Sequence, residues 1–171
     1  LKGAICLEYV GEYLVISHRR ETPTEPDVKG VQLRAIIQHL KAHPEIKYVW
    51  FDHWCVPQGQ RTIEEKAEFD ATLPQINLLY IGCRVLALVD LSYVSRFWTQ
   101  FEAWLSLQLV TPDGLRGAKY STRCTFVCIH NATAAVEQQI RILWGSRNAQ
   151  EARDVLAAPD VTVTNQKDKE I

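Results

Sequence analysis

The sequence lacks several features that would place it in a well-marked class of proteins. Its formal net charge is −1, so it has no basic excess of the kind that a nucleic-acid-binding surface or a polybasic membrane patch requires. No apolar run approaches the length of a membrane span. The opening LKGAICLEYVGEY is too short and too interrupted for a signal peptide. Nucleic-acid and membrane partners are therefore not expected.

Cysteine is present in a number and spacing that argue against a secreted scaffold. The five cysteines are odd in number, which favours free thiols in a reducing, cytoplasmic compartment. Cys124 and Cys128 lie four residues apart on an expected strand, about 13 Å at strand rise, which is too far to share a metal ion. Cys55 and His53 are too close in sequence to form a Cys–His nucleophile readily. No metal site is expected.

Three common catalytic and phosphate-binding motifs are also missing. There is no G-x-G-x-x-G and no G-x-x-x-x-G-K-[ST], which excludes the Rossmann fingerprint and the P-loop. There is no G-x-S-x-G elbow of an α/β hydrolase. The first expected strand ends in His-Arg-Arg and not in acidic residues, which excludes a phosphoacceptor receiver domain.

The length of 171 residues fits a single domain, residues 1–171. Because the chain does not begin with Met, we expect a domain taken from a longer multidomain protein. Residues 165–171, NQKDKEI, are expected to begin a linker or tail.

Short apolar runs alternate with helical patterns along the chain. Strands are expected over residues 13–17, 48–52, 84–90, 125–130 and 161–164. Helices are expected over residues 31–42, from Thr62 with an interruption at Pro74, over 97–109, and once or twice within 132–156. This alternation predicts an α/β fold, a flavodoxin-like three-layer sandwich with a five-stranded parallel sheet in the order 2-1-3-4-5.

In such sheets ligands bind beyond the carboxyl ends of the strands, so the residues that follow each strand are candidate site residues. The first strand is followed by His18, Arg19 and Arg20. The second strand leads to Asp52 and Trp54, and the third leads to the helix within SRFWTQFEAWLS. We expect a cleft where these segments meet.

The helix in SRFWTQFEAWLS carries an acid, Glu102, among aromatic residues. Phe97, Phe101, Trp104 and Leu105 follow the spacing of a core-facing stripe. Trp98 and Glu102 are separated by four residues and share the neighbouring face. From this pattern alone, a solvated surface glutamate is the more common outcome, with a pocket residue as the alternative.

Three segments together resemble a TIR domain, and more closely the divergent TIR-like branch. YLVISHRRE resembles the first strand and the following Ser-aromatic-Arg segment, although His18 stands where an aromatic residue is usual. YVWFDHWCVPQG resembles the second strand and BB loop, and SRFWTQFEAWL resembles the Ser-x-x-Trp-x-x-x-Glu helix. The three occur in the family order and cover most of the chain.

The resemblance implies an NAD glycohydrolase that acts as a signalling domain in an immune or cell-death protein. It assigns catalysis to Glu102 and substrate contacts to His18, Arg19, Arg20, Asp52 and Trp98, with Trp54 as a further candidate. NAD is the substrate and no cofactor is implied. Self-association through TIR–TIR contacts is expected, since family members often need it for activity.

Two other functions remain open at this stage. A non-catalytic TIR-like module would only assemble with like domains. An N-glycosidic transferase acting on nucleosides would also place a Glu at this edge of an α/β sheet, although the arginine pair favours a phosphorylated substrate. Release of nicotinamide from NAD, or of a base from nucleosides, separates the three.

Overall fold

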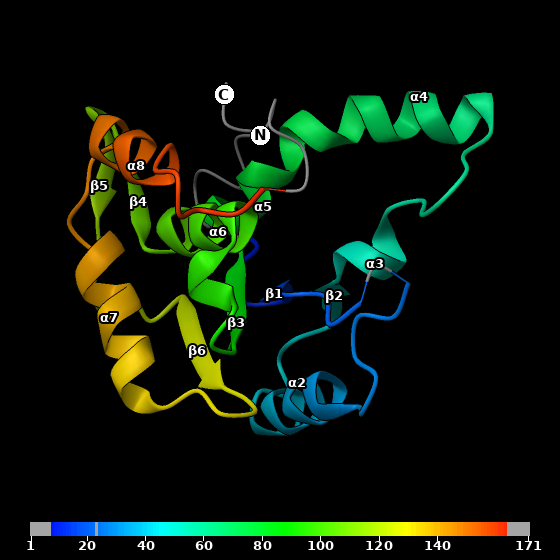
Figure 1. Cartoon of the computed structure of the whole chain (residues 1–171), viewed down its shortest axis with the longest axis horizontal. Coiled ribbons are helices and arrows are strands. Elements are labelled where there is room, and N and C mark those ends of the chain that lie inside the picture. The colour runs from blue at the N-terminus through cyan, green and yellow to red at the C-terminus, as the bar shows by residue number, and fades with distance from the viewer. Residues whose placement is uncertain (1–7, 23, 164–171) are drawn as a thin grey trace.

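A parallel sheet of four strands lies at the centre of the structure, a computed structural model that describes residues 8–22 and 24–163 (Figure 1). Its strands are β1 (Tyr13–His18), β2 (Tyr48–Trp50), β3 (Arg84–Val89) and β6 (Cys124–Cys128). They run in the order β2-β1-β3-β6, which is the order expected for the first four strands of a flavodoxin-like sheet. The central strands β1 and β3 are almost wholly buried, as their continuous apolar sequences predict.

The fifth strand expected over residues 161–164 does not extend this sheet within the part of the chain that the structure describes. Thr162 forms an isolated parallel bridge with Arg96, donating its N–H to the carbonyl of Ser95 (2.7 Å) and accepting from the N–H of Phe97 (3.0 Å). Val161, the residue before Thr162, is buried in the core cluster. The segment therefore pairs with the entry to a helix, and Thr164 and the tail at 165–171 lie outside the described residues.

The helices and the remaining strands follow the chain in a fixed order. They are α2 (Val31–Ala42), α3 (Asp52–Cys55), α4 (Ile63–Thr72), η1 (Leu73–Gln75), α5 (Ile76–Gly82), η2 (Tyr93–Ser95), α6 (Phe97–Ser106), β4 (Gln108–Thr111), β5 (Gly114–Gly117), α7 (Ala134–Trp144) and α8 (Ala149–Leu156). The bounds of α2 coincide with the predicted helix, and the segment 132–156 contains two helices.

The start of α4 and its end also follow the sequence. Thr62 and Glu65 form the predicted capping box, in which each side chain accepts a hydrogen bond from the other residue's backbone N–H. The α-helix ends at Thr72, and Pro74 lies in the 3₁₀ turn η1 that follows. None of the α4 residues is buried, and the helix projects away from the sheet (Figure 1).

The helix expected over 97–109 is shorter than predicted, because the chain enters a hairpin. α6 ends at Ser106, and Gln108 pairs with Gly117 in the antiparallel ladder of β4 and β5. The turn TPDG carries its glycine, Gly114, at φ 114°, a backbone conformation that other residues rarely adopt. This hairpin was not predicted, since its short strands follow a helical pattern without interruption.

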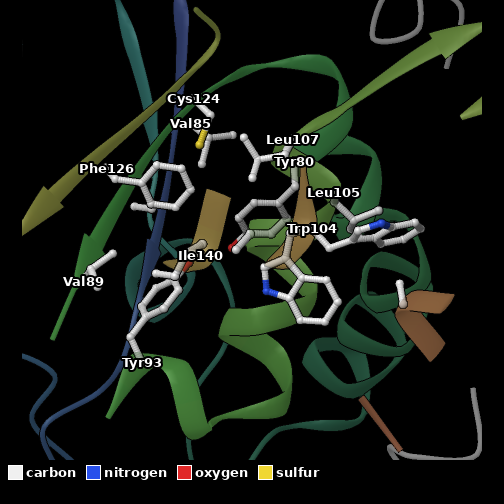
Figure 2. Packing of buried hydrophobic residues seen from close by; sticks show 14 of the residues in the cluster. Tyr80, Val85, Val89, Tyr93, Trp104, Leu105, Leu107, Cys124, Phe126 and Ile140 are labelled. Atoms are coloured by element: carbon white, nitrogen blue, oxygen red, sulfur yellow. The ribbon is translucent and has the colours of Figure 1, made fainter. Parts of the chain in front are cut away.

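Two hydrophobic clusters bury the two faces of the sheet. Val15, Val85, Ala87 and Phe126 point to the face covered by α5, α6, α7 and α8. Leu14, Ile16, Leu86 and Leu88 point to the opposite face, where α2 contributes Ile36. Figure 2 shows the rings of Tyr80, Tyr93, Trp104 and Phe126 within the first cluster. The strand residues alternate between the faces, as a pleated strand requires.

On the face of the sheet covered by α5 and α6, a buried arginine connects the ends of these two helices and the start of β4. Arg123 is 4% exposed and lies just before β6. Its guanidinium donates to backbone carbonyls of Tyr80, Cys83, Leu105, Ser106 and Gln108. All but the last of these carbonyls lie at the carboxyl-terminal ends of α5 and α6, where a positive charge is favourable, and Gln108 begins β4. Arg123 therefore holds in register the two helices that carry Tyr80 and Glu102.

Among the helices that the structure describes, none has the length and apolar character needed to cross a membrane.

Candidate functional site

A pocket of about 420 Å³ opens at the carboxyl ends of β1 and β2. The residues that line it come from the end of β1 and the segment after it, from β2, from α3 to α5 with the loop between α3 and α4, from α6, and from Thr162 and Val163. The position agrees with the rule that ligands of parallel sheets bind at the carboxyl edge. It also matches the volume of sites that take drug-sized ligands.

Six of the seven residues predicted from the sequence line this one pocket. They are His18, Arg19, Arg20, Asp52, Trp98 and Glu102. Three separate segments of the chain supply them, so the fold brings together residues that are up to 84 positions apart, from His18 to Glu102.

Trp54 does not line the pocket, contrary to its predicted place. It lies two residues after Asp52 on the four-residue helix α3, which rotates it by roughly 200° from Asp52 about the helix axis. Its ring instead packs on Phe51, with the ring centroids 4.7 Å apart, and the residue is 68% exposed. Trp54 is therefore a surface residue on the outer side of α3.

The core-facing stripe of α6 lies largely as its spacing predicts. Phe97, Trp104 and Leu105 are buried, and Phe101 is half-buried. Trp98 packs edge-on against Phe97, with the ring centroids 5.2 Å apart, on the face that borders the pocket. Glu102 follows one turn later and lines the same pocket.

Glu102 is held by a chain of hydroxyl groups that the sequence did not reveal. Ser17, the completely buried penultimate residue of β1, donates to Oε2 of Glu102 over 2.6 Å. The Ser17 Oγ is also 2.6 Å from the hydroxyl of Tyr93, which therefore donates to Ser17 when Ser17 donates to Glu102. The hydroxyl of Tyr80 donates to the carbonyl of Ile16 over 3.4 Å and lies close enough to Glu102 to influence its ionisation. The acid is fixed from the core side and faces the pocket on the other.

Burial raises the pKa of Glu102 from 4.5 to about 8, and the neighbouring charge of Asp52 adds to this rise. The hydrogen bond from Ser17 and the nearby hydroxyl of Tyr80 act in the opposite direction because they stabilise the ionised form. The side chain keeps some exposed surface where it borders the pocket, although protein surrounds it on its other sides. At neutral pH the free protein therefore holds Glu102 mostly protonated.

Asp52 has the opposite character. Its Oδ1 is 2.8 Å from Nε2 of His18, and its Oδ2 accepts from Nη2 of Arg20 over 2.8 Å. Burial acts to raise the pKa of Asp52, but the bonds and charges of His18 and Arg20 outweigh it and lower the pKa from 3.8 to about 2. The pocket thus contains one ionised carboxylate and one carboxyl that titrates near pH 8.

The arginines after β1 are also engaged with the protein. Nε of Arg19 donates to Oδ2 of Asp90 over 2.7 Å, and its Nη1 donates to the carbonyl of Arg20 over 2.9 Å. Arg20 pairs with Asp52 and donates to the side chain of Gln58 over 2.9 Å. These contacts fix the strand-end segment in place.

Aromatic side chains form much of the remaining wall. Trp50, Phe69, Phe97 and Trp98 all border the pocket. Trp50 contacts Tyr80 edge-on, with the ring centroids 6.1 Å apart. Flat aromatic walls beside a few fixed polar groups suit a ligand that contains planar rings.

Several pocket residues were missed from the sequence. The sequence indicates Trp50 only as a strand residue and gives no site role to Arg61, Asn77 or Arg96, although all four line the pocket. For Arg96 a signal existed, since it directly precedes the helix already assigned to the cleft. For Arg61 and Asn77 there was none, because their position depends on the path of the α4 segment.

No metal centre is present in the described part of the chain. Within it, no group of three or more His, Cys, Asp and Glu side chains could hold a metal ion. Cys124 is buried in the core cluster, and burial raises the pKa of its thiol to about 12, so it is an inert packing residue.

Chemically, the site combines a buried carboxyl, aromatic walls and several guanidinium groups in one cavity. A carboxylate in such surroundings can stabilise a developing positive charge, and arginines favour an anionic group on the same ligand. Comparisons of the chain with protein-family models, with curated proteins and with solved structures find no match.

Proposed function

We propose that the chain is a TIR-like domain that cleaves the bond between nicotinamide and ribose in NAD, with Glu102 as the catalytic residue. One observation carries this proposal. The carboxyl of Glu102 lies in a 420 Å³ pocket between aromatic walls, hydrogen-bonded to Ser17 on its inner side. This is the placement that the resemblance in SRFWTQFEAWL implies for a pocket acid, and it differs from that of a solvated surface glutamate.

The reaction needs a single carboxylate. The bond from the ribose C1′ to the pyridinium nitrogen breaks, and its electron pair neutralises the positive charge on nicotinamide. No proton has to be delivered to this leaving group, so the second carboxyl that most glycosidases use is not required. What remains is a ribose cation of oxocarbenium type, which the Glu102 carboxylate stabilises from close by.

Water completes the reaction. Its oxygen forms the new bond to C1′ and its proton passes to Glu102 or to solvent, which gives ADP-ribose. Attack by a group of the same nucleotide in place of water would give a cyclised product. Asp52 remains ionised and bound to His18 and Arg20 throughout, so its role is to hold the segment after β1 in position.

The protonation state of Glu102 couples to substrate binding. The pKa of about 8 belongs to the free protein, and a pyridinium ring entering beside the carboxyl favours its ionised form. Binding of NAD thus releases a proton below pH 8. The positive charge of the substrate thus favours the ionised form of Glu102, which is the form that stabilises the transition state.

The test is direct. Purified domain, free and in a tethered or crowded form, is incubated with NAD and separately with nucleosides, and free nicotinamide or base is measured. We expect nicotinamide release by the wild type and its loss in Glu102→Gln. The matched control is Glu68→Gln, which makes the same change on an exposed face of α4. Release from NAD that survives in folded Glu102→Gln rejects the proposal.

The second candidate is a module that only self-associates, and one observation favours it. Trp54 and Ile63 are 68% and 86% exposed, so the surface near α3 and α4 offers apolar side chains to a second copy. Self-association with no nicotinamide release in any assembled form supports this alternative. Base release from nucleosides supports a transferase instead.

A further inference from the structure

The arginines that line the pocket differ in whether a carboxylate of the protein is already paired with them. Four arginines line it: Arg19, Arg20, Arg61 and Arg96. Arg19 is paired with Asp90 and Arg20 with Asp52, each over less than 3 Å. An anion that approached either of these two would compete with a carboxylate already in place.

Arg61 lies in the loop between α3 and α4 and is held without a carboxylate. Its guanidinium carbon is 3.8 Å from the centroid of the Phe69 ring, and its Nε donates to the carbonyl of Pro57 over 2.9 Å. These two contacts fix the plane of the group. Within the residues described, no partner is found for its two Nη groups, so both remain available as donors.

Arg96 also lines the pocket and lies at the N-cap of α6. Its backbone is fixed by the bridge to Thr162, but its guanidinium has no hydrogen-bond or ion-pair partner in the described ranges 8–22 and 24–163. The first turn of this ten-residue helix contains no acidic side chain. The positive end of the helix dipole therefore adds to the charge of Arg96.

The balance of charge in the pocket follows from these contacts. Asp52 is paired with Arg20 and hydrogen-bonded to His18, and Glu102 is mostly protonated in the free protein at neutral pH. Arg61 and Arg96 are left as cations whose charge no described carboxylate offsets. A cavity with aromatic walls and two such guanidinium groups is suited to a ligand with both flat rings and phosphate.

We propose that Arg61 and Arg96 form the subsite for the pyrophosphate of a dinucleotide, and that Arg19 and Arg20 serve to hold the strand end in place. The identity of the ligand rests on the proposed function, since NAD joins its two nucleosides by a pyrophosphate. The subsite itself can be tested without any reaction. It also makes the site selective for phosphorylated ligands over free nucleosides.

The experiment measures binding by calorimetry with three probes: inorganic pyrophosphate, ADP-ribose and adenosine. The proteins are the wild type, Arg61→Gln, Arg96→Gln and the control Arg116→Gln, which removes an exposed arginine of β5 outside the pocket. We expect each pocket variant to lose about tenfold or more in affinity for pyrophosphate and ADP-ribose, the size of one charge-assisted hydrogen bond. We expect Arg116→Gln to bind as the wild type does.

The outcomes separate the subsite from the reaction. Lost pyrophosphate affinity in both variants supports the subsite even if the wild type releases no nicotinamide, which would reject only the proposed function. Unchanged affinity in both variants, or a wild type that does not bind pyrophosphate, overturns the subsite. If NAD is cleaved and the KM for NAD is unaltered in both variants, the function stands and the subsite is again overturned.

Discussion

Replacing Glu102 by glutamine should make the protein more stable, and the gain should grow with pH. In the folded protein the pKa of Glu102 is about 8, compared with an ordinary value of 4.5. Below pH 4.5 the group is protonated in both the folded and unfolded states and costs nothing. Between these two values the unfolded chain has lost its proton and the folded protein has kept it. The folded state therefore binds more protons, and stability falls as pH rises.

The size of the effect follows from the two pKa values. The full difference corresponds to about 5 kcal/mol, reached above pH 8. From pH 5 to pH 7 this group alone lowers the free energy of unfolding by about 2.5 kcal/mol, and from pH 5 to pH 9 by about 4 kcal/mol. Glutamine has the shape of the protonated acid and does not titrate, so Glu102→Gln is free of this loss.

The measurement is urea unfolding followed by tryptophan fluorescence at pH 5, 7 and 9, for the wild type and for Glu102→Gln. The difference between the two proteins cancels the titration of the other groups. We expect the free energy of unfolding of the variant, relative to that of the wild type, to increase by about 4 kcal/mol from pH 5 to pH 9. The control Glu68→Gln should follow the wild type. A difference that does not change with pH would show that Glu102 ionises as a solvated acid does, and would remove the basis of the pocket assignment.

Three further predictions concern the surroundings of this acid. Ser17→Ala removes a hydrogen bond that lowers the pKa of Glu102, so the pH profile of nicotinamide release should move about one pH value upwards; an unmoved profile contradicts this role. Asp52→Asn should cost about 1 kcal/mol at pH 7 and nothing near pH 2, because the pKa of Asp52 is lowered to about 2 and its contribution disappears as pH falls through that value; urea unfolding at both pH values measures it. Arg123→Met should cost about 3 kcal/mol or more in urea unfolding by leaving buried carbonyls unpaired, and a loss below 1 kcal/mol would contradict its role.

Much of the fold could be predicted because it depends on local patterns. The central strands are continuous apolar runs, and α2 has a regular apolar stripe, so periodicity locates both. The face shared by Trp98 and Glu102 also follows from helical spacing alone. Residues that follow parallel strands necessarily meet at one sheet edge, and this rule placed His18 and Asp52 in one pocket.

The remaining features depend on contacts between distant segments. Residues 161–163 have the composition of a strand, but Thr162 pairs with Arg96 at the start of α6, and the segment does not join the central sheet. The hairpin of β4 and β5 interrupts a helical pattern through a turn whose glycine needs a positive φ. Trp54 was placed by its closeness to Asp52, whereas the rotation of α3 sends it to the outer surface.

The ionisation states and ion pairs of the site residues could not be predicted from the sequence either. A glutamate on a helix titrates in the ordinary range unless it is buried, and the burial of Glu102 depends on how α6 packs against the end of β1. The pairing of Arg19 with Asp90 joins side chains 71 positions apart. A sequence can suggest that both are near the cleft, but which acid each arginine meets is decided by packing.

The pH dependence of nicotinamide release tests the central claim most directly. kcat/KM for NAD is measured from pH 6 to pH 9.5 for the wild type and for Glu102→Gln. If ionised Glu102 stabilises the ribose cation, kcat/KM of the wild type rises about tenfold for each pH unit and levels off near pH 8. The variant then shows no release above background. Equal release by the two proteins, or a wild-type value that does not change between pH 6 and pH 9.5, would contradict the assignment of Glu102 as the catalytic residue.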